Sequence, residues 1–219
     1  MTNGSDDFIE QMKQYFHILT NNFFKGNFGE EQGELLHKRY LEEFNRLFSR
    51  NFDIMPDHLS KRHGINSIFV MAYNFAADEM NLSFEELKNQ IISIYRIMLH
   101  DIYEQQKRNL IESDNPLELF KENVKKGNKS LYDNEYFQLE YVPENDKIVI
   151  GFNLHRCIYF EIFEKNGQPE LGPILCEYDY LLADAVKNWV TFERTETIAD
   201  GFKCCNFRFL YKQNEIHNI

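Results

Sequence analysis

The hydrophobic pattern changes from a helical to a strand period at residues 136–152, which read YFQLEYVPENDKIVIGF. Apolar and polar side chains alternate over residues 136–142, and residues 147–152 are rich in strand-forming residues. The intervening Pro-Glu-Asn-Asp sequence is typical of a turn. Two such runs around a turn predict a β-hairpin.

Upstream of this hairpin, apolar residues recur every three or four positions, which indicates helices. We expect helices at residues 6–24, 30–48, 65–80, about 84–112 and about 116–126. The stretches 22–29 and 51–66 contain glycine or proline and are expected to be connectors, and Gly127 is expected to end the last helix. Ser83 and Glu86 match a capping box at the start of the fourth helix.

Downstream of the hairpin, the pattern predicts two helices, at residues 155–165 and 171–188, and then two strands, at 189–197 and 205–211. The expected fold class is therefore α+β. We expect a helical N-terminal two-thirds packed on a small antiparallel sheet, made of two hairpins with an intervening helix pair. The expected organisation is a single domain of residues 1–219. Residues 1–130 form its helical portion and residues 131–219 its α+β portion.

Charge and composition exclude several classes of protein. The formal net charge is −11, whereas a nucleic-acid-binding protein normally presents a basic face to phosphates. The sequence contains no run of about 18 apolar residues, so we expect no membrane span. Residues 1–7 lack the basic and apolar parts of a signal peptide. With few cysteines in an acidic chain, we expect a cytoplasmic protein. We also expect a small-molecule substrate, on the resemblance described below, and a chain able to form a homodimer through its N-terminal helices.

The four cysteines are Cys157, Cys176, Cys204 and Cys205, and none forms a Cys-x-x-Cys pair. A composite zinc site of His155, Cys157, Cys176 and Cys205 would have suitable ligand types, but the spacing is not diagnostic. We expect no cofactor and no metal. In the alternative interpretation, each cysteine is a small buried hydrophobic residue.

Two positions in this region could carry chemistry. Cys157 is expected in the first turn of its helix, beside Arg156 and near His155, and such an electropositive setting lowers the pKa of a thiol. Asp179 follows Cys176 by three residues, on the same helical face, and a carboxylate there would raise the pKa of the Cys176 thiol. Asp179 itself is a candidate general base or an anchor for a loop amide.

Several short motifs in the last third occur in a fixed order: 152–157 (FNLHRC), 167–171 (GQPEL), 176–179 (CEYD), 192–201 (FERTETIADG) and 205–209 (CNFRF). Together they resemble the L-2-amino-thiazoline-4-carboxylic acid hydrolase family. The closing Thr-x3-Gly-x3-Cys-x-Phe pattern is also similar to 4-vinyl-reductase-type domains, which implies a related fold without a shared activity. The family usually has Cys-Asp-Phe at the end, where this chain has Asn206. The missing acid either serves catalysis or metal binding, or only caps a turn, as Asn also does.

The resemblance implies a hydrolase that opens a cyclic C–N bond of L-2-amino-thiazoline-4-carboxylate, or an analogue, to give a carbamoyl-cysteine. It implies the following roles: Arg194 for the substrate carboxylate, Asp179 for the amidine or the water, Cys157, Cys176 or Cys205 as nucleophile, His155 as proton shuttle, and Thr197 and Asn206 as further substrate-binding residues. In one alternative, Arg194 and Asp179 form a buried ion pair and the cysteines only pack. In another, the scaffold is a non-catalytic domain that senses a small molecule or a metal.

Overall fold

The computed structural model describes residues 4–212, with side chains from Asp7 onward. It divides into two compact units. The first, called here the helical unit, comprises the chain up to Ile97 together with Ile158–Leu175. The second, called the sheet unit, comprises Met98–Cys157 and the chain from Cys176 onward. The single domain of residues 1–219 stays a prediction. Residues 1–7 were expected to lack a signal peptide, and residues 1–3 of that segment lie outside the described residues.

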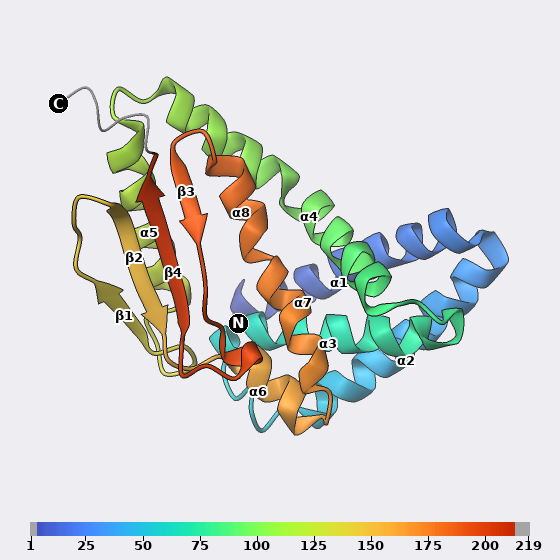
Figure 1. The fold of residues 1–219 in the computed structure, drawn as a ribbon. Helices are drawn as coiled ribbons and strands as arrows, with labels where there is room; N and C mark the ends of the chain where they lie inside the picture. The colour runs from blue at the N-terminus through green and yellow to red at the C-terminus, as the bar shows by residue number, and fades with distance from the viewer. Residues whose placement is uncertain (1–3, 213–219) are drawn as a thin grey trace. The chain divides into compact units, whose positions relative to one another are not determined.

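The helical unit consists mainly of long helices (Figure 1). Its elements are α1 (Gly4–Phe28), α2 (Glu30–Arg50), α3 (His58–Ala77), η1 (Asp78–Met80), the first half of α4 (Phe84–Glu112), α6 (Ile158–Lys165), η2 (Pro169–Leu171) and the start of α7 (Gly172–Glu177). Phe16 stacks on Phe69 with ring centroids 4.4 Å apart, and Tyr95 meets Phe69 edge-on at 5.6 Å. All three rings are fully buried, as expected for large side chains that carry most of a core's hydrophobic area.

Two expected connectors are shorter than the sequence indicated. Helix α1 continues to Phe28, and only Gly29, with a φ of 84°, separates it from α2, so the predicted break over 22–29 is wrong. Helix α3 begins at His58 instead of residue 65. Its start is capped by Asp57, whose carboxylate accepts the Ser60 backbone N–H at 2.7 Å. The predicted capping box of α4 is confirmed, since the Glu86 N–H and carboxylate both bond Ser83.

The sheet unit confirms the predicted α+β fold class. It contains the rest of α4, α5 (Pro116–Leu131), β1 (Leu139–Val142), β2 (Ile148–Leu154), α8 (Asp179–Val186), β3 (Val190–Glu193), η3 (Ile198–Asp200) and β4 (Cys205–Tyr211). The four strands are antiparallel in the order β1-β2-β4-β3, so two hairpins are joined through β2 and β4. Figure 1 shows α5 behind this sheet, and Phe120 of α5 meets Phe209 of β4 edge-on at 5.0 Å.

Several boundaries in this unit differ from the prediction. Helix α5 runs through Gly127 to Leu131, because its capping contacts form later, where the Tyr132 N–H donates to the Asn128 carbonyl at 2.7 Å. Strand β1 starts only at Leu139, since Gln138 has a φ of 52° that breaks the extended backbone. The second helix of the predicted pair is divided into η2, α7 and α8.

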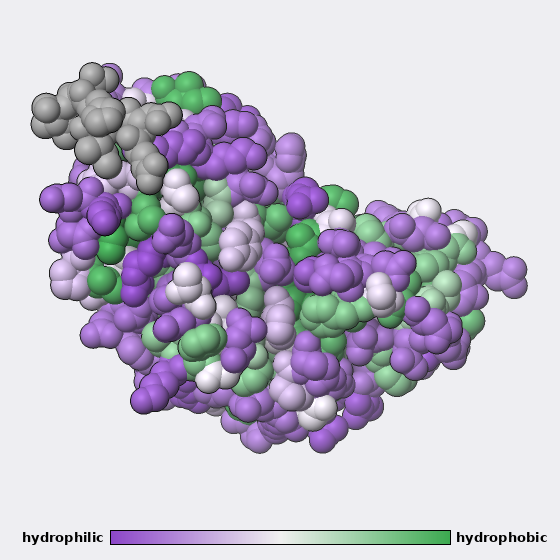
Figure 2. Space-filling model, in the orientation of Figure 1, coloured by the Kyte–Doolittle hydropathy of each residue, from purple (hydrophilic) through white to green (hydrophobic). Residues whose placement is uncertain are grey.

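Hydrophilic residues cover most of the face drawn in Figure 2, and apolar residues lie between them, some of them in groups. On α1 and α2 the exposed apolar side chains include Tyr15, Ile18 and Leu35. No helix within residues 4–212 is both long enough and apolar enough to cross a membrane. The homodimer through the N-terminal helices stays a prediction.

Gly64 of α3 provides a test of the packing in the helical unit. A Cβ at this position would lie 2.1 Å from Met55 Sδ and 2.8 Å from Ile162 Cδ1. We expect Gly64→Ala to lower the free energy of unfolding by about 1–3 kcal/mol, measured in urea, because overpacking forces neighbours apart. Gly127→Ala is the matched control. Nothing lies within 4 Å of its added Cβ, and Ala favours the helix by about 0.5–1 kcal/mol. Equal stability of the two variants would contradict the packing at α3 and α6.

Candidate active site

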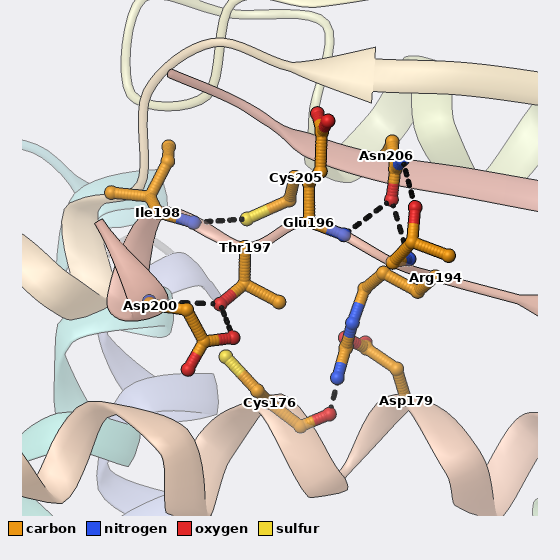
Figure 3. Close-up of polar contacts among 10 residues, drawn as sticks. Cys176, Asp179, Arg194, Glu196, Thr197, Ile198, Asp200, Cys205 and Asn206 are labelled. Carbon is orange, nitrogen blue, oxygen red and sulfur yellow. Dashed lines mark hydrogen bonds and ion pairs between the residues drawn. The ribbon is translucent and has the colours of Figure 1, made fainter. Parts of the chain in front are cut away.

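The loop between β3 and β4 is held by Asn206. Its Oδ1 accepts the backbone N–H groups of Thr195 and Glu196, each at 2.9 Å, and its Nδ2 donates to Thr195 Oγ1 at 2.9 Å. Figure 3 shows this amide directed at the loop backbone. These three hydrogen bonds all serve the loop, so Asn206 performs the turn-anchoring role that an Asp could also perform.

The next part of the loop is a small turn whose polar groups bond one another. Thr197 Oγ1 donates to Asp200 Oδ2 at 2.6 Å and accepts the Asp200 backbone N–H at 3.1 Å. The Ile198 N–H donates to Cys205 Sγ at 3.3 Å (Figure 3). Gly201 closes the turn in the left-handed region. Thr197 is only 4% exposed, so its hydroxyl belongs to this network.

Arg194 links the end of β3 to the junction of α7 and α8. Its Nη1 donates to the carbonyl of Cys176 at 2.9 Å and forms an ion pair with Asp179 Oδ2. The guanidinium carbon lies 5.1 Å from the centroid of the Tyr180 ring and 5.8 Å from that of Phe207, within cation–π range. The Arg194 side chain is 5% exposed and its buried Nε has no hydrogen-bond partner among the described residues, whereas the Asp179 side chain is 25% exposed.

Burial dominates the electrostatics of this cluster. It raises the pKa of Asp179 to about 6, although the nearby Arg194 guanidinium acts in the opposite direction. Burial also raises the pKa of the Cys176 thiol to about 12 and raises the pKa of Cys205. Burial alone would lower the pKa of Arg194, but the Asp179 carboxylate and other neighbours hold it above its usual value. At neutral pH the cluster thus contains two neutral thiols, and the pKa of its carboxyl group, about 6, lies close to neutral pH.

The structure brings together six of the eight predicted site residues: Cys176, Asp179, Arg194, Thr197, Cys205 and Asn206 (Figure 3). His155 instead pairs with Glu140 across the first hairpin, Nε2 to Oε2 at 2.7 Å, and this bond lowers the pKa of Glu140. Helix α6 begins at Ile158, so Cys157 precedes the helix instead of lying in its first turn.

The expected site did not include two neighbouring features. Asp200 is absent from the predicted site, although its spacing from Thr197 is that of a capping box, Thr-x-x-Asp, and could have identified the pair. Tyr103 of α4 lies near Tyr178 and Asp179, and burial, followed by these neighbours, raises its pKa. No local sequence pattern connects Tyr103 to residues so far along the chain.

Metal ligands are not assembled in the part of the chain that the structure describes. Within residues 4–212, no group of three or more His, Cys, Asp and Glu side chains is placed to hold a metal ion. The composite zinc site drawn from His155, Cys157, Cys176 and Cys205 is therefore not formed there, and His155 bonds Glu140 instead.

The fold and this cluster define an α+β protein whose sheet unit brings together a carboxylate, a guanidinium and two thiols. More particularly, the chain belongs to the family described as L-2-amino-thiazoline-4-carboxylic acid hydrolase, whose model matches residues 61–209. The match extends well upstream of the motifs in the last third. No curated protein and no solved structure matches the chain.

Substitutions at Asn206 test whether the family's acid is needed here. In Asn206→Asp a carboxylate still accepts both loop N–H groups and the Thr195 hydroxyl can donate to it, so we expect a change of less than about 1 kcal/mol in the free energy of unfolding. Asn206→Ala leaves the two N–H groups unpaired, and we expect a loss of about 1–3 kcal/mol. Urea unfolding measures both. If Asn206→Asp destabilised the protein as much as Asn206→Ala, the anchoring role would be wrong.

Proposed function

We propose that the protein is a hydrolase that opens the ring of L-2-amino-thiazoline-4-carboxylate, or a close analogue, at C2 to give a carbamoyl-cysteine. The observation that carries this proposal is the state of Asp179. Burial raises the pKa of this carboxyl to about 6, and a quarter of the side chain still reaches solvent. A carboxylate with a pKa near the working pH is suited to general-base catalysis. The family membership supports a hydrolase of this kind.

The substrate's charged groups complement the charged side chains of the cluster. Its protonated amidine is a planar N–C–N cation with the geometry of a guanidinium, which Asp179 already binds in the form of Arg194. Asp179 uses Oδ2 for that pair, and its other oxygen would hold the amidine of the substrate. Arg194 Nη1 donates to Asp179 and to the Cys176 carbonyl, while the neighbouring Nε has no hydrogen-bond partner among the described residues. That edge of the guanidinium is the one that would hold the substrate carboxylate.

The reaction needs one water and no redox partner. Asp179 takes a proton from the water as its oxygen bonds to C2, and the tetrahedral intermediate then collapses. Collapse breaks one ring bond, and the proton on Asp179 passes to the departing ring atom. Cleavage of C2–N, the bond that the family resemblance implies, gives the S-carbamoyl isomer with a free amine. Cleavage of C2–S gives the N-carbamoyl isomer with a free thiol.

The thiols support attack by water over attack by sulfur. A thiol reacts as its thiolate, and burial raises the pKa of both Cys176 and Cys205. With the pKa of Cys176 at about 12, on the order of one molecule in 10⁵ would carry a thiolate at neutral pH. In this proposal the two cysteines shape the cluster next to Asp179, and water is the nucleophile.

A turnover assay with defined variants tests the proposed base. The purified protein is incubated with L-2-amino-thiazoline-4-carboxylate; mass spectrometry detects the carbamoyl-cysteine, and a thiol reagent distinguishes its isomers. We expect Asp179→Asn to lower kcat at least about 100-fold, as loss of a general base does. Arg194→Lys keeps the charge but loses the paired N–H edge, so we expect a higher KM.

Cys204→Ser is the matched control, because it alters a thiol next to Cys205 that is outside the proposed chemistry, and we expect unchanged kcat. Cys157→Ala and His155→Ala test the remaining predicted residues. Loss of turnover in Cys157→Ala, with activity kept in Asp179→Asn, would overturn the assignment of the base. Tight binding without turnover by the wild-type protein would instead support the sensor domain.

The pH dependence has a defined sign. Asp179 acts as a base only when ionised, and its pKa in the folded protein is about 6. We therefore expect kcat/KM to rise about tenfold per pH unit below pH 6 and to level off above it. The profile of the free enzyme is measured at low substrate concentration. A flat profile through this range, or an unchanged profile in the residual activity of Asp179→Asn, would show that another group controls the reaction.

A further inference from the structure

The aromatic ring of Tyr180 packs against the guanidinium of Arg194. Tyr180 follows Asp179 directly in α8, and the guanidinium carbon lies 5.1 Å from the centroid of its ring. The same ring meets Phe192 of β3 edge-on, with centroids 5.3 Å apart. Tyr180 is 39% exposed, whereas the Arg194 side chain is 5% exposed. The ring therefore contacts the buried guanidinium while part of it remains at the surface.

Hydrogen bonds alone do not fix the plane of this guanidinium. Within residues 4–212, its hydrogen bonds all leave from Nη1, to the carbonyl of Cys176 at 2.9 Å and to the carboxylate of Asp179. Figure 3 shows Arg194 reaching the helical segment that carries both acceptors. A bidentate pair through two nitrogens would define a plane, but bonds from a single nitrogen let the group rotate about it. Packing must therefore fix the direction of the Nε edge.

Two aromatic rings lie within cation–π range of the guanidinium, and their surroundings differ. Phe207 lies 5.8 Å from the guanidinium carbon, is 8% exposed, and stacks on Phe152 at 4.8 Å within the sheet. Tyr180 lies closer to the guanidinium and is far more exposed. A substitution at Tyr180 therefore alters the contact with Arg194 without opening the packed sheet.

We propose that Tyr180 is a positioning residue, whose ring holds the guanidinium of Arg194 in the plane that presents its Nε edge to a carboxylate. The inference rests on the proposed function and deepens it, since it identifies what keeps the anion-binding edge in place. The contact requires an aromatic face and not the phenol hydroxyl, so Phe should replace Tyr180 without loss, whereas an aliphatic side chain should not.

The pKa of Asp179 distinguishes this role from simple shielding. Burial raises this pKa to about 6, and Arg194 acts against that rise. If the ring holds Arg194 in place, its loss lets the guanidinium turn away from the carboxylate, and the pKa of Asp179 rises further. If the ring only excludes water, its loss hydrates the carboxyl, and the pKa falls toward the usual 3.8. The two roles thus predict changes of opposite sign.

The other groups that act on this carboxyl stay in place when Tyr180 is changed. Glu177 raises the pKa of Asp179, and the Cys176 thiol and the Tyr103 phenol of α4 lie near it. A difference between the wild-type protein and a Tyr180 variant therefore reports the contact between Tyr180 and Arg194.

A carbon-13 NMR titration of the full-length protein, with labelled aspartate carboxyl carbons, measures this pKa without any need for turnover. Asp179→Asn assigns the signal. We expect Tyr180→Leu to raise the pKa of Asp179 by at least about 0.5 and Tyr180→Phe to leave it as in the wild-type protein. Tyr141→Leu is the matched control, because Tyr141 of β1 is similarly exposed, at 43%, and its ring meets Phe152. An unchanged or lowered pKa in Tyr180→Leu, or an equal rise in Tyr180→Phe, would overturn the proposal.

Steady-state kinetics at about pH 8 test the dependence on the substrate carboxylate. For L-2-amino-thiazoline-4-carboxylate we expect Tyr180→Leu to raise KM at least about fivefold and to change kcat less than about twofold, because a misdirected Nε edge weakens ground-state and transition-state binding alike. For 2-amino-2-thiazoline, which lacks the carboxylate, KM should be the same in both proteins. An equal rise for both compounds would overturn the proposal. Absence of all turnover would contradict the hydrolase, and the titration would still decide the role of Tyr180.

Discussion

The ion pair between Arg194 and Asp179 joins the two elements of the sheet unit that carry the site. Arg194 follows β3 directly, and Asp179 opens α8. The same guanidinium nitrogen also donates to the carbonyl of Cys176 at the end of α7, so one side chain spans the break between α7 and α8. Breaking a buried pair by removing one partner costs about 3–5 kcal/mol, because the other charge is left uncompensated. The interaction that would orient the base therefore also holds the loop and helix junction together.

Most of the fold could be predicted from the sequence, because the sequence patterns that indicate it most strongly are local. The alternating segment after residue 136, the Ser83 capping box and the helical stripes depend on neighbours within a few positions. The errors occurred where a cap or a single backbone angle determines a boundary. Asp57 starts α3 earlier than its apolar run indicates, and Gln138 delays β1. Glycine is a weak terminator, since Gly127 lies inside α5.

Less of the candidate site could be predicted from the sequence, because its contacts are formed by tertiary structure. The spacing of Cys176 and Asp179 on one helical face was visible, but their meeting with Arg194 requires β3 to lie beside α8. The effect of Asn206 could be stated only as two alternatives until its bonds to the loop N–H groups were known. Those bonds show that an amide at this position holds the loop between β3 and β4 in this chain.

Asp179 also shows a conflict between stability and chemistry. Its pKa in the folded protein, about 6, lies above the usual 3.8, so the fold favours the protonated carboxyl. The resulting stability is fully present below pH 3.8 and is lost as the pH rises through about 6, a difference on the order of 2–3 kcal/mol. The proposed reaction needs the ionised form, which exists only where this stability has been lost. In the proposed reaction, a cationic amidine bound beside the carboxylate would favour its ionised form, so we expect the proposed site to prefer a positively charged ring to a neutral one.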